Sequence, residues 1–295
     1  MPDREHSAWF WPIIVADMIG VAIMSLGVHI LMLQIFGVPF PDRSAVSIWA
    51  SFLNTVVAVV ALSLAYAAAE PRLATCSPWL RWLIVAGLFG TLKELFRAQL
   101  MNGVVTTAWI FSAFQLVAPT IYSLALGAFV VFVIPRFKRV WQRLVCAAAV
   151  AAVMAFAVRP LSALALSPLM QSIADLNHAD VYPFPYGWHV LFWAYVTYLE
   201  PVAACFVAAA LILPGLSPRP WLRLAQFTVL IMAIKGVLLP TPLFAFYNPL
   251  GLGMGMLSES QFLLEGLLLG APVALIWTVA NGIRPDRLPV RGAAA

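Results

Sequence analysis

Three ionisable residues interrupt a stretch that otherwise has the composition of a membrane helix. The stretch "PWLRWLIVAGLFGTLKELFR" runs from Pro78 to Arg97 and contains Lys93, Glu94 and Arg97 near its end. An ionisable group inside a bilayer costs roughly 3 kcal/mol on insertion scales, so it normally faces a bundle interior and has a partner or a function. Glu94 and Arg97 are spaced to pair on one helix face, whereas Lys93 needs an acid from another helix.

Other apolar stretches carry ionisable residues at a comparable depth. Glu200 and Glu265 are the acids that can neutralise Lys93, and Lys235 competes for them. The candidate substrate-binding residues are Lys93, Glu94, Arg97, Glu200, Lys235, Glu265 and His189, and the first apolar stretch adds Asp17 and His29.

Neutral polar residues recur at helical spacing in three of the apolar stretches. They are His189, Trp193 and Thr197 before Glu200; Ser112, Gln115, Pro119 and Ser123; and Ser47, Ser51 and Asn54. Such stripes predict a hydrated cavity that opens to the outside. Helix breakers accompany the charges, since Pro201 follows Glu200 and Gly236 follows Lys235. A helix interrupted at mid-membrane is typical of transporter binding sites, although an ordinary proline kink has the same sequence pattern.

The composition predicts an all-α, polytopic integral membrane protein that forms a single transmembrane domain over residues 1–295. Hydrophobic residues make up 63% of the chain and charged residues 10%, with a mean hydropathy of +0.95. The net charge of +5 is attributed to arginines that set membrane topology, so we expect lipids and no nucleic acid as partners. Three isolated cysteines indicate neither a disulfide framework nor a cysteine metal site.

Apolar runs of about 20 residues, bounded by Pro, Gly or charge, predict about eight membrane spans. A turn at Asn102 and Gly103 separates the third span from the fourth, and the first span is expected to remain uncleaved. The two longest loops, 159–187 and 247–260, are expected outside, the first with a short interfacial helix and an aromatic belt. The predicted spans are 9–37, 45–69, 79–101, 104–134, 140–158, 188–213, 221–246 and 261–282.

Basic residues predict that both termini are cytoplasmic and that the protein lies in the plasma (inner) membrane. Arg43 and Arg159 are the basic residues of the opposite loops, and the tail 285–295 is expected to be cytoplasmic. The residues assigned to the cytoplasmic side are Arg4, Arg72, Arg81, Arg136, Lys138, Arg139, Arg143, Arg219, Arg223, Arg284, Arg287 and Arg291.

A second stretch, "PWLRLAQFTVLIMAIKGVLL" from Pro220 to Leu239, aligns with the first without a gap. In both copies the lysine follows the tryptophan of "PWLR" by 14 residues, and Lys93 and Lys235 are 142 residues apart. An offset of four spans predicts a parallel 4+4 repeat, with halves 1–139 and 140–284. The alternative is chance, because Trp and Arg commonly begin helices at the cytoplasmic interface.

The first functional hypothesis is a transporter or channel with an outward-facing cavity that binds an anionic small molecule or a lipid headgroup. Lys93 and Lys235 would attract the anion, and Glu200 and Glu265 would compensate charge or exchange protons. The second is an intramembrane enzyme for a lipid-linked substrate at the outer leaflet, with Glu200 or Glu265 as general base. No enzyme motif is present, so whether the protein is an enzyme is left open.

Further alternatives involve a cofactor or a purely structural role. A quinol-binding membrane subunit could ligate haem through His29 and His189, and copper(I) could be bound by Met254 and Met256 near His178 and His189. Every buried charge could instead be a contact between helices. The cofactor is unknown, and a homo-oligomer or a partner membrane subunit is compatible with the sequence.

Overall fold

The computed structural model describes residues 5–176 and 184–280, with side chains described from residue 12 onward. Every regular element in these residues is helical, so the predicted all-α class is confirmed. Short π-helical or 3₁₀ segments extend or join several helices. The α-helices are α1 (Glu5–Gln34), α2 (Ile48–Leu73), α3 (Pro78–Leu92), α4 (Leu95–Thr106), α5 (Trp109–Gln115), α6 (Val117–Ala128), α7 (Val140–Val153), α8 (Arg159–Ser172), α9 (Trp188–Ile212), α10 (Pro220–Lys235), α11 (Pro240–Leu243) and α12 (Leu252–Ala280).

The protein is a multi-pass helical membrane protein. Within the described residues, six helical segments are long and apolar enough to cross a bilayer. A seventh span is obtained if α10 and the segment Pro240–Tyr247, bent by 57° at the break, are counted together. The structure thus shows six or seven candidate spans where the sequence predicted about eight, and the predicted third span is the shorter apolar helix α3. The six segments are Pro12–Gln34, Ile48–Leu73, Trp109–Arg136, Val140–Ser172, Trp188–Gly215 and Leu252–Ala280.

The predicted boundary between the third and fourth spans is wrong. Asn102 and Gly103 lie inside α4, and the chain breaks instead at Glu94 and at Thr107, both in the left-handed region with φ 63° and 62°. Gly103 serves close packing, because a Cβ there would lie 2.4 Å from Cε3 of Trp109. The chain thus folds back after α4, and the Trp109 ring packs against the Gly103 backbone.

Two predicted outer loops are largely helical. The helix that begins as α7 continues through the π-helical turn Met154–Val158 into α8, so residues 159–172 extend a span and form no separate interfacial helix. The last span begins at Leu252, because a turn in which Asn248 Oδ1 accepts the Leu250 N–H (2.8 Å) ends at Gly251, φ 89°. The predicted span ends at residues 158 and 261 are therefore wrong.

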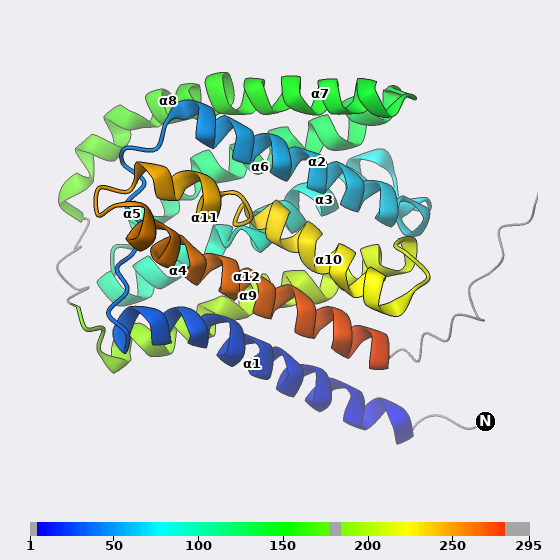
Figure 1. Ribbon diagram of the computed structural model, residues 1–295, viewed down its shortest axis with the longest axis horizontal. Helices are drawn as coiled ribbons and strands as arrows, with labels where there is room; N and C mark the ends of the chain where they lie inside the picture. Colours follow the sequence, from blue (N-terminus) through cyan, green and yellow to red (C-terminus); the bar gives the residue numbers. More distant parts are fainter. Residues whose placement is uncertain (1–4, 177–183, 281–295) are drawn as a thin grey trace, which may run out of the picture.

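The long helices form one bundle in which α9 is the central span (Figure 1). In its apolar window 61% of the residues are buried, against 22–33% for the other long segments. α9 packs against α1, α2, α3, α4 and α12, while α2 packs against α7, α9 and α10. Outward faces remain apolar, as lipid contact requires: Val140 and Trp221 are 75% and 68% exposed.

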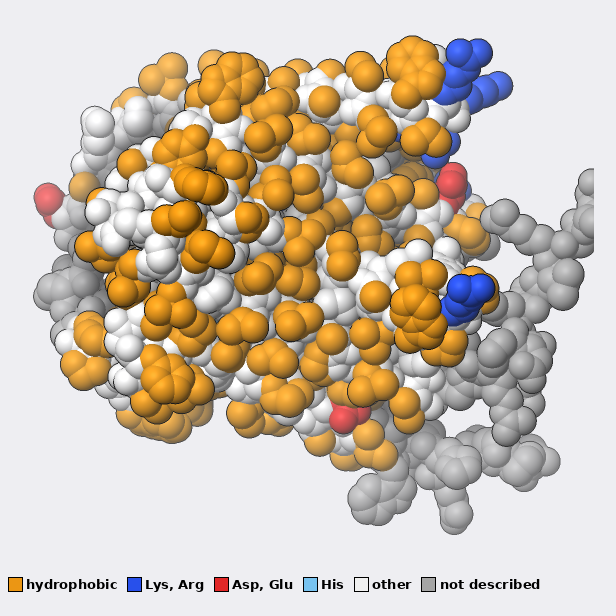
Figure 2. Space-filling model, viewed as in Figure 1, with side chains coloured by type: hydrophobic (Ala, Val, Ile, Leu, Met, Phe, Trp, Pro, Cys, Tyr) orange, Lys and Arg blue, Asp and Glu red, His pale blue; other side chains and the backbone are white. Residues whose placement is uncertain are grey.

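The described chain enters and leaves the bundle at one end, where α1 begins and α12 ends (Figure 1). The Lys and Arg side chains visible in Figure 2 gather at this same end. Which side of the membrane this end faces stays a prediction. Several predictions concern residues outside the described ranges: Arg4, His178, Arg284, Arg287, Arg291, the tail 285–295 and Tyr182, which belongs to the predicted aromatic belt of the 159–187 loop.

Two helix pairs approach closely at a glycine. A Cβ at Gly127 of α6 would lie 2.8 Å from the Ala86 Cβ of α3. A Cβ at Gly270 of α12 would lie 3.1 Å from the Thr228 Cα of α10. Small residues of this kind let membrane helices pack backbone to backbone, and they fix α3 and α10 against the spans that follow them.

Candidate functional site

Two interrupted helices position the ionisable cluster. α3 has 15 residues and α10 has 16, so each extends only about 22–24 Å at 1.5 Å per residue, less than the ~30 Å hydrocarbon core. Lys93 is the C-terminal cap of α3, and Lys235 is the last residue of α10, capped by Gly236 at φ 74°. Positive charge at a helix C-terminus is favoured by the helix dipole. Both lysines are therefore held at breaks in the chain.

Glu94 links the two breaks. Its Oε1 accepts a hydrogen bond from Lys235 Nζ, and its Oε2 accepts one from Arg97 Nη1. The Lys235 and Glu94 side chains are 5% and 19% exposed, so this is a largely buried ion pair between elements 141 residues apart. The pairing of Glu94 with Arg97 expected from the sequence is present, and Lys235 joins it.

Glu265 on α12 lies on the other side of Lys235. Its Oε1 is 3.4 Å from Lys235 Nζ, and its Oε2 is 3.9 Å from His29 Nδ1 of α1. Tyr198 of α9 closes the cluster: its ring centroid lies 5.0 Å from Arg97 Cζ and 5.7 Å from Lys235 Nζ. The buried cluster thus joins five helices, α1, α4, α9, α10 and α12.

A small hydrogen-bonded chain fixes Tyr198 to the neighbouring helices. The Tyr198 hydroxyl is 2.6 Å from Ser25 Oγ, which donates to the main-chain oxygen of Glu265 at 2.7 Å. Because the Ser25 hydroxyl proton is used in the bond to Glu265, the Tyr198 hydroxyl donates to Ser25 Oγ. α1, α9 and α12 are thereby held together directly beside the charges.

Among the described residues, Glu200 binds main-chain groups and no side-chain cation. Its Oε1 accepts the Phe96 N–H at 3.1 Å and its Oε2 accepts the Arg97 N–H. These are first-turn amides of α4, which no intrahelical acceptor satisfies. The helix cap that Glu94 would usually provide thus comes from α9, which leaves the Glu94 carboxylate available for Lys235 and Arg97.

Lys93 differs from the other two cations of the cluster. Its Nζ donates to the main-chain oxygen of Lys235 at 3.3 Å and lies 5.7 Å from the centroid of the Phe89 ring. Within the described residues no carboxylate lies within 4.0 Å of this ammonium, and the residue is exposed. Asn54 is a neighbour, donating from Nδ2 to the Gly236 oxygen at 3.0 Å.

His189 lies outside this cluster. It is the second residue of α9 and is exposed, whereas Glu200 lies 11 residues further along the same helix, about 16 Å away at 1.5 Å per residue. Six of the seven candidate residues are thus brought together, and their role in binding stays a prediction. In the described part of the chain, no group of three or more His, Cys, Asp or Glu side chains is arranged to hold a metal ion.

The loop before α2 is tied to the start of α12 on the side of the cluster away from the basic end. Arg43 donates from Nε and Nη2 to the two oxygens of Glu259 at 2.9 and 2.6 Å. Ser258 Oγ and Gln261 Nε2 add hydrogen bonds of 2.7 and 2.8 Å to the Pro39 oxygen. A bidentate pair with a 2% exposed carboxylate is a strong contact.

Sequence reasoning missed Tyr198, Ser25 and the Arg43–Glu259 pair. Tyr198 has the apolar surroundings of an ordinary core residue, and its contact with two cations depends on how α4 and α10 approach α9. No spacing within one helix could have indicated it.

Comparison with known proteins gives no match: no protein-family model, no curated protein and no solved structure is significantly similar to the chain. The geometry of the cluster is therefore the basis for assigning a function.

Proposed function

We propose that the protein is a membrane transporter that binds an anionic group of its substrate at the Lys93 ammonium. The proposal rests on one observation: the three cations Lys93, Arg97 and Lys235 are not equally neutralised by carboxylates. Lys235 and Arg97 bind carboxylate oxygens of Glu94, whereas Lys93, among the described residues, hydrogen-bonds only to a main-chain oxygen. A carbonyl oxygen carries only partial negative charge, so the ammonium can still bind an anion.

The neighbouring cations are neutralised by carboxylates. Lys235 is paired with Glu94 and Glu265, and Arg43 is paired with Glu259. Lys93 has no such partner among the described residues, so an anion would bind chiefly to this one ammonium.

The chain breaks supply hydrogen-bonding groups beside the ammonium. Interrupted membrane helices leave polar backbone groups that a cavity, water or substrate must satisfy. Buried side-chain atoms without a hydrogen-bond partner in the described residues include Asn54 Oδ1, Arg97 Nε and His29 Nδ1. These groups surround the cluster on three helices, and a bound substrate could satisfy them.

The two lysines then have different functions. The sequence suggested that both attract the anion, but Lys235 lies between Glu94 and Glu265, so we assign it to holding the two chain breaks together. The enzyme hypothesis has less support, because Glu200 is engaged by the α4 amides and Glu265 lies beside Lys235.

The test is charge movement in proteoliposomes on a solid-supported membrane, with chloride, phosphate, acetate and succinate added in turn. We expect at least one anion to produce a current that Lys93→Met abolishes. Arg72→Met, which removes an exposed cation from the last turn of α2, is the matched control and should keep the current. No current with any of these anions, or an equal current in Lys93→Met, would contradict the proposal.

A further inference from the structure

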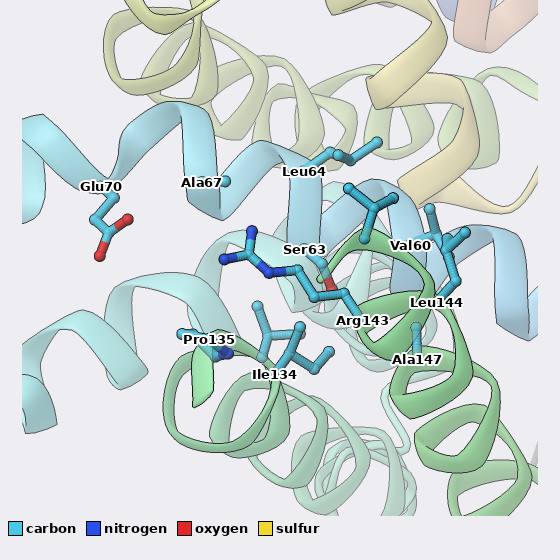
Figure 3. Close-up of a pocket in the computed structure, with 12 residues that line it drawn as sticks. Val60, Ser63, Leu64, Ala67, Glu70, Ile134, Pro135, Arg143, Leu144 and Ala147 are labelled. Atoms are coloured by element: carbon cyan, nitrogen blue, oxygen red, sulfur yellow. The ribbon is translucent and has the colours of Figure 1, made fainter. Parts of the chain in front are cut away.

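A groove of about 160 Å³ lies between α2, the end of the α6 span (Trp109–Arg136) and the start of α7 (Figure 3). None of the residues that line it belongs to the ionisable cluster. Its walls are apolar and come from three segments, with Val60 and Leu64 on α2, Ile134 and Pro135 at the end of the α6 span, and Leu144 on α7. A single water needs only about 10–15 Å³ by this measure. The groove therefore has room for a larger apolar group.

The groove opens onto the lipid-facing surface. Leu64 and Leu144 are 57% and 50% exposed, and Ala67 is also exposed. The surrounding helices are membrane spans, so the molecules that reach this groove are lipids. Acyl chains match apolar walls of this kind.

Charged side chains mark one end of the groove. Arg143 and Glu70 lie there on α7 and α2, and in Figure 3 the Arg143 guanidinium lies across the groove beside Ile134 and Ser63. Arg143 Nε donates to the Phe137 oxygen at 2.7 Å, which orients the side chain and leaves the two terminal nitrogens for another acceptor. No carboxylate lies within 4.0 Å of this guanidinium among the described residues.

Positive charge predominates at this end. The exposed segment between the α6 span and α7 contains Arg136, Lys138 and Arg139, and Arg143 follows one turn later. Glu70 is the one acid of the groove lining. Basic pockets between membrane helices bind anionic lipid headgroups, and arginine matches a phosphate with two parallel hydrogen bonds.

We propose that this groove binds one anionic phospholipid, with an acyl chain between α2 and α7 and the phosphate on the Arg143 guanidinium. The lipid binds here by two contacts at once, an apolar chain contact and a charge contact. Either contact alone is available to many surface positions, and their combination gives selectivity for anionic over zwitterionic lipid. This inference does not depend on the transport proposal.

Native mass spectrometry of the purified protein tests the site, with phosphatidylglycerol and phosphatidylcholine of identical chains added in equal amounts. We expect one phosphatidylglycerol to be retained at least about tenfold more than phosphatidylcholine. Arg143→Gln should abolish this preference and Arg143→Lys should restore part of it, since lysine binds phosphate as a point charge. Glycerol phosphate, which lacks chains, should not be retained.

Filling the groove tests the chain contact separately. Ala67→Phe places a ring in the groove and should reduce retention of both lipids, whereas Ala16→Phe, at an exposed alanine of α1, should not. Unchanged preference in Arg143→Gln together with unchanged retention in Ala67→Phe would overturn the proposal. So would a dimer that Ala67→Phe abolishes, since a second copy of the chain would then occupy the groove.

Discussion

The breaks after α3 and after α10 have the same place in their helices and use different residues. Each helix begins with Pro-Trp-Leu-Arg and ends at a lysine, and in both cases the residue after the lysine turns the chain through the left-handed region. After α10 that residue is Gly236, at φ 74°. After α3 it is Glu94, at φ 63°, where a non-glycine residue is unfavourable.

The two residues differ in what they provide: Gly236 provides space, and Glu94 provides charge. A Cβ at Gly236 would lie 3.3 Å from Lys93 Nζ and 3.2 Å from Asn54 Nδ2, so the glycine leaves room for the ammonium. The carboxylate of Glu94 neutralises Lys235 and Arg97, and this interaction offsets the unfavourable backbone conformation of Glu94. Both contacts thus run from the first break to the second: the Glu94 carboxylate reaches Lys235, and the Lys93 ammonium lies against Gly236.

The largest effect is expected for Glu94→Gly, which removes the charge and relieves the backbone. Breaking a buried ion pair costs about 3–5 kcal/mol, and the relieved backbone returns about 1–2 kcal/mol, so a net loss remains. Equilibrium unfolding in mixed micelles measures it. The matched control is Thr107→Gly, an exposed residue at φ 62° that should gain up to about 1 kcal/mol. A gain in both variants would show that the carboxylate does not stabilise the break.

Lys235→Met and Lys93→Met compare the two lysines directly. Lys235→Met should lower the free energy of unfolding by about 3 kcal/mol, because Glu94 and Glu265 lose a shared cation in a buried site. Lys93→Met, at an exposed lysine, should change it by less than about 0.5 kcal/mol. Equal losses measured by the same unfolding experiment would contradict the different functions assigned to the two lysines.

Gly236→Ala tests the space at the second break. We expect a loss of about 1–2 kcal/mol, because alanine is disfavoured at positive φ and its Cβ pushes against the Lys93 ammonium. The melting temperature of the detergent-solubilised protein reports the loss. In a Lys93→Met background the loss should change, whereas strictly additive effects would indicate that the two groups are not in contact.

The smallest effect is expected where α3 packs against α6 and where α10 packs against α12. Gly127→Ala should destabilise the protein by up to about 1 kcal/mol, since crowding against Ala86 exceeds the helix preference of alanine. Gly270→Ala, with its closest contact at 3.1 Å, should be close to neutral. The same melting measurement compares them, and the reverse order would contradict the closer approach of α6 to α3.

These two contacts also bear on the predicted repeat. Ala86 and Thr228 are 142 residues apart, as Lys93 and Lys235 are, and their glycine partners are 143 apart. The helix contacts correspond under the same offset, which relates α2 to α9, α7 to α1 and α10 to α3. α2 contacts α7 and α10, and α9 contacts α1 and α3. The 4+4 repeat itself stays a prediction.

Hydropathy could predict the long helices and the ionisable residues that meet in the cluster, because apolar length and isolated charge are local properties. It could not predict the breaks at Glu94 and Thr107. Both residues disfavour the left-handed region, so they resemble helix-continuing residues, and the turn-like pair Asn102–Gly103 lies within α4. The contact of Lys235 with Glu265 was among the expected pairings, but its pairing with Glu94 was hidden, because it depends on how α3 and α10 meet.

Anion binding at Lys93 requires that this ammonium makes the space beside Asn54 attractive to anions. Asn54→Cys, with Cys76, Cys146 and Cys205 replaced, places a thiol there for anionic and cationic methanethiosulfonate reagents of similar size. We predict that the anionic reagent reacts about tenfold faster than the cationic one, and that Lys93→Met removes this preference. Equal rates for both reagents with Lys93 present would contradict the account.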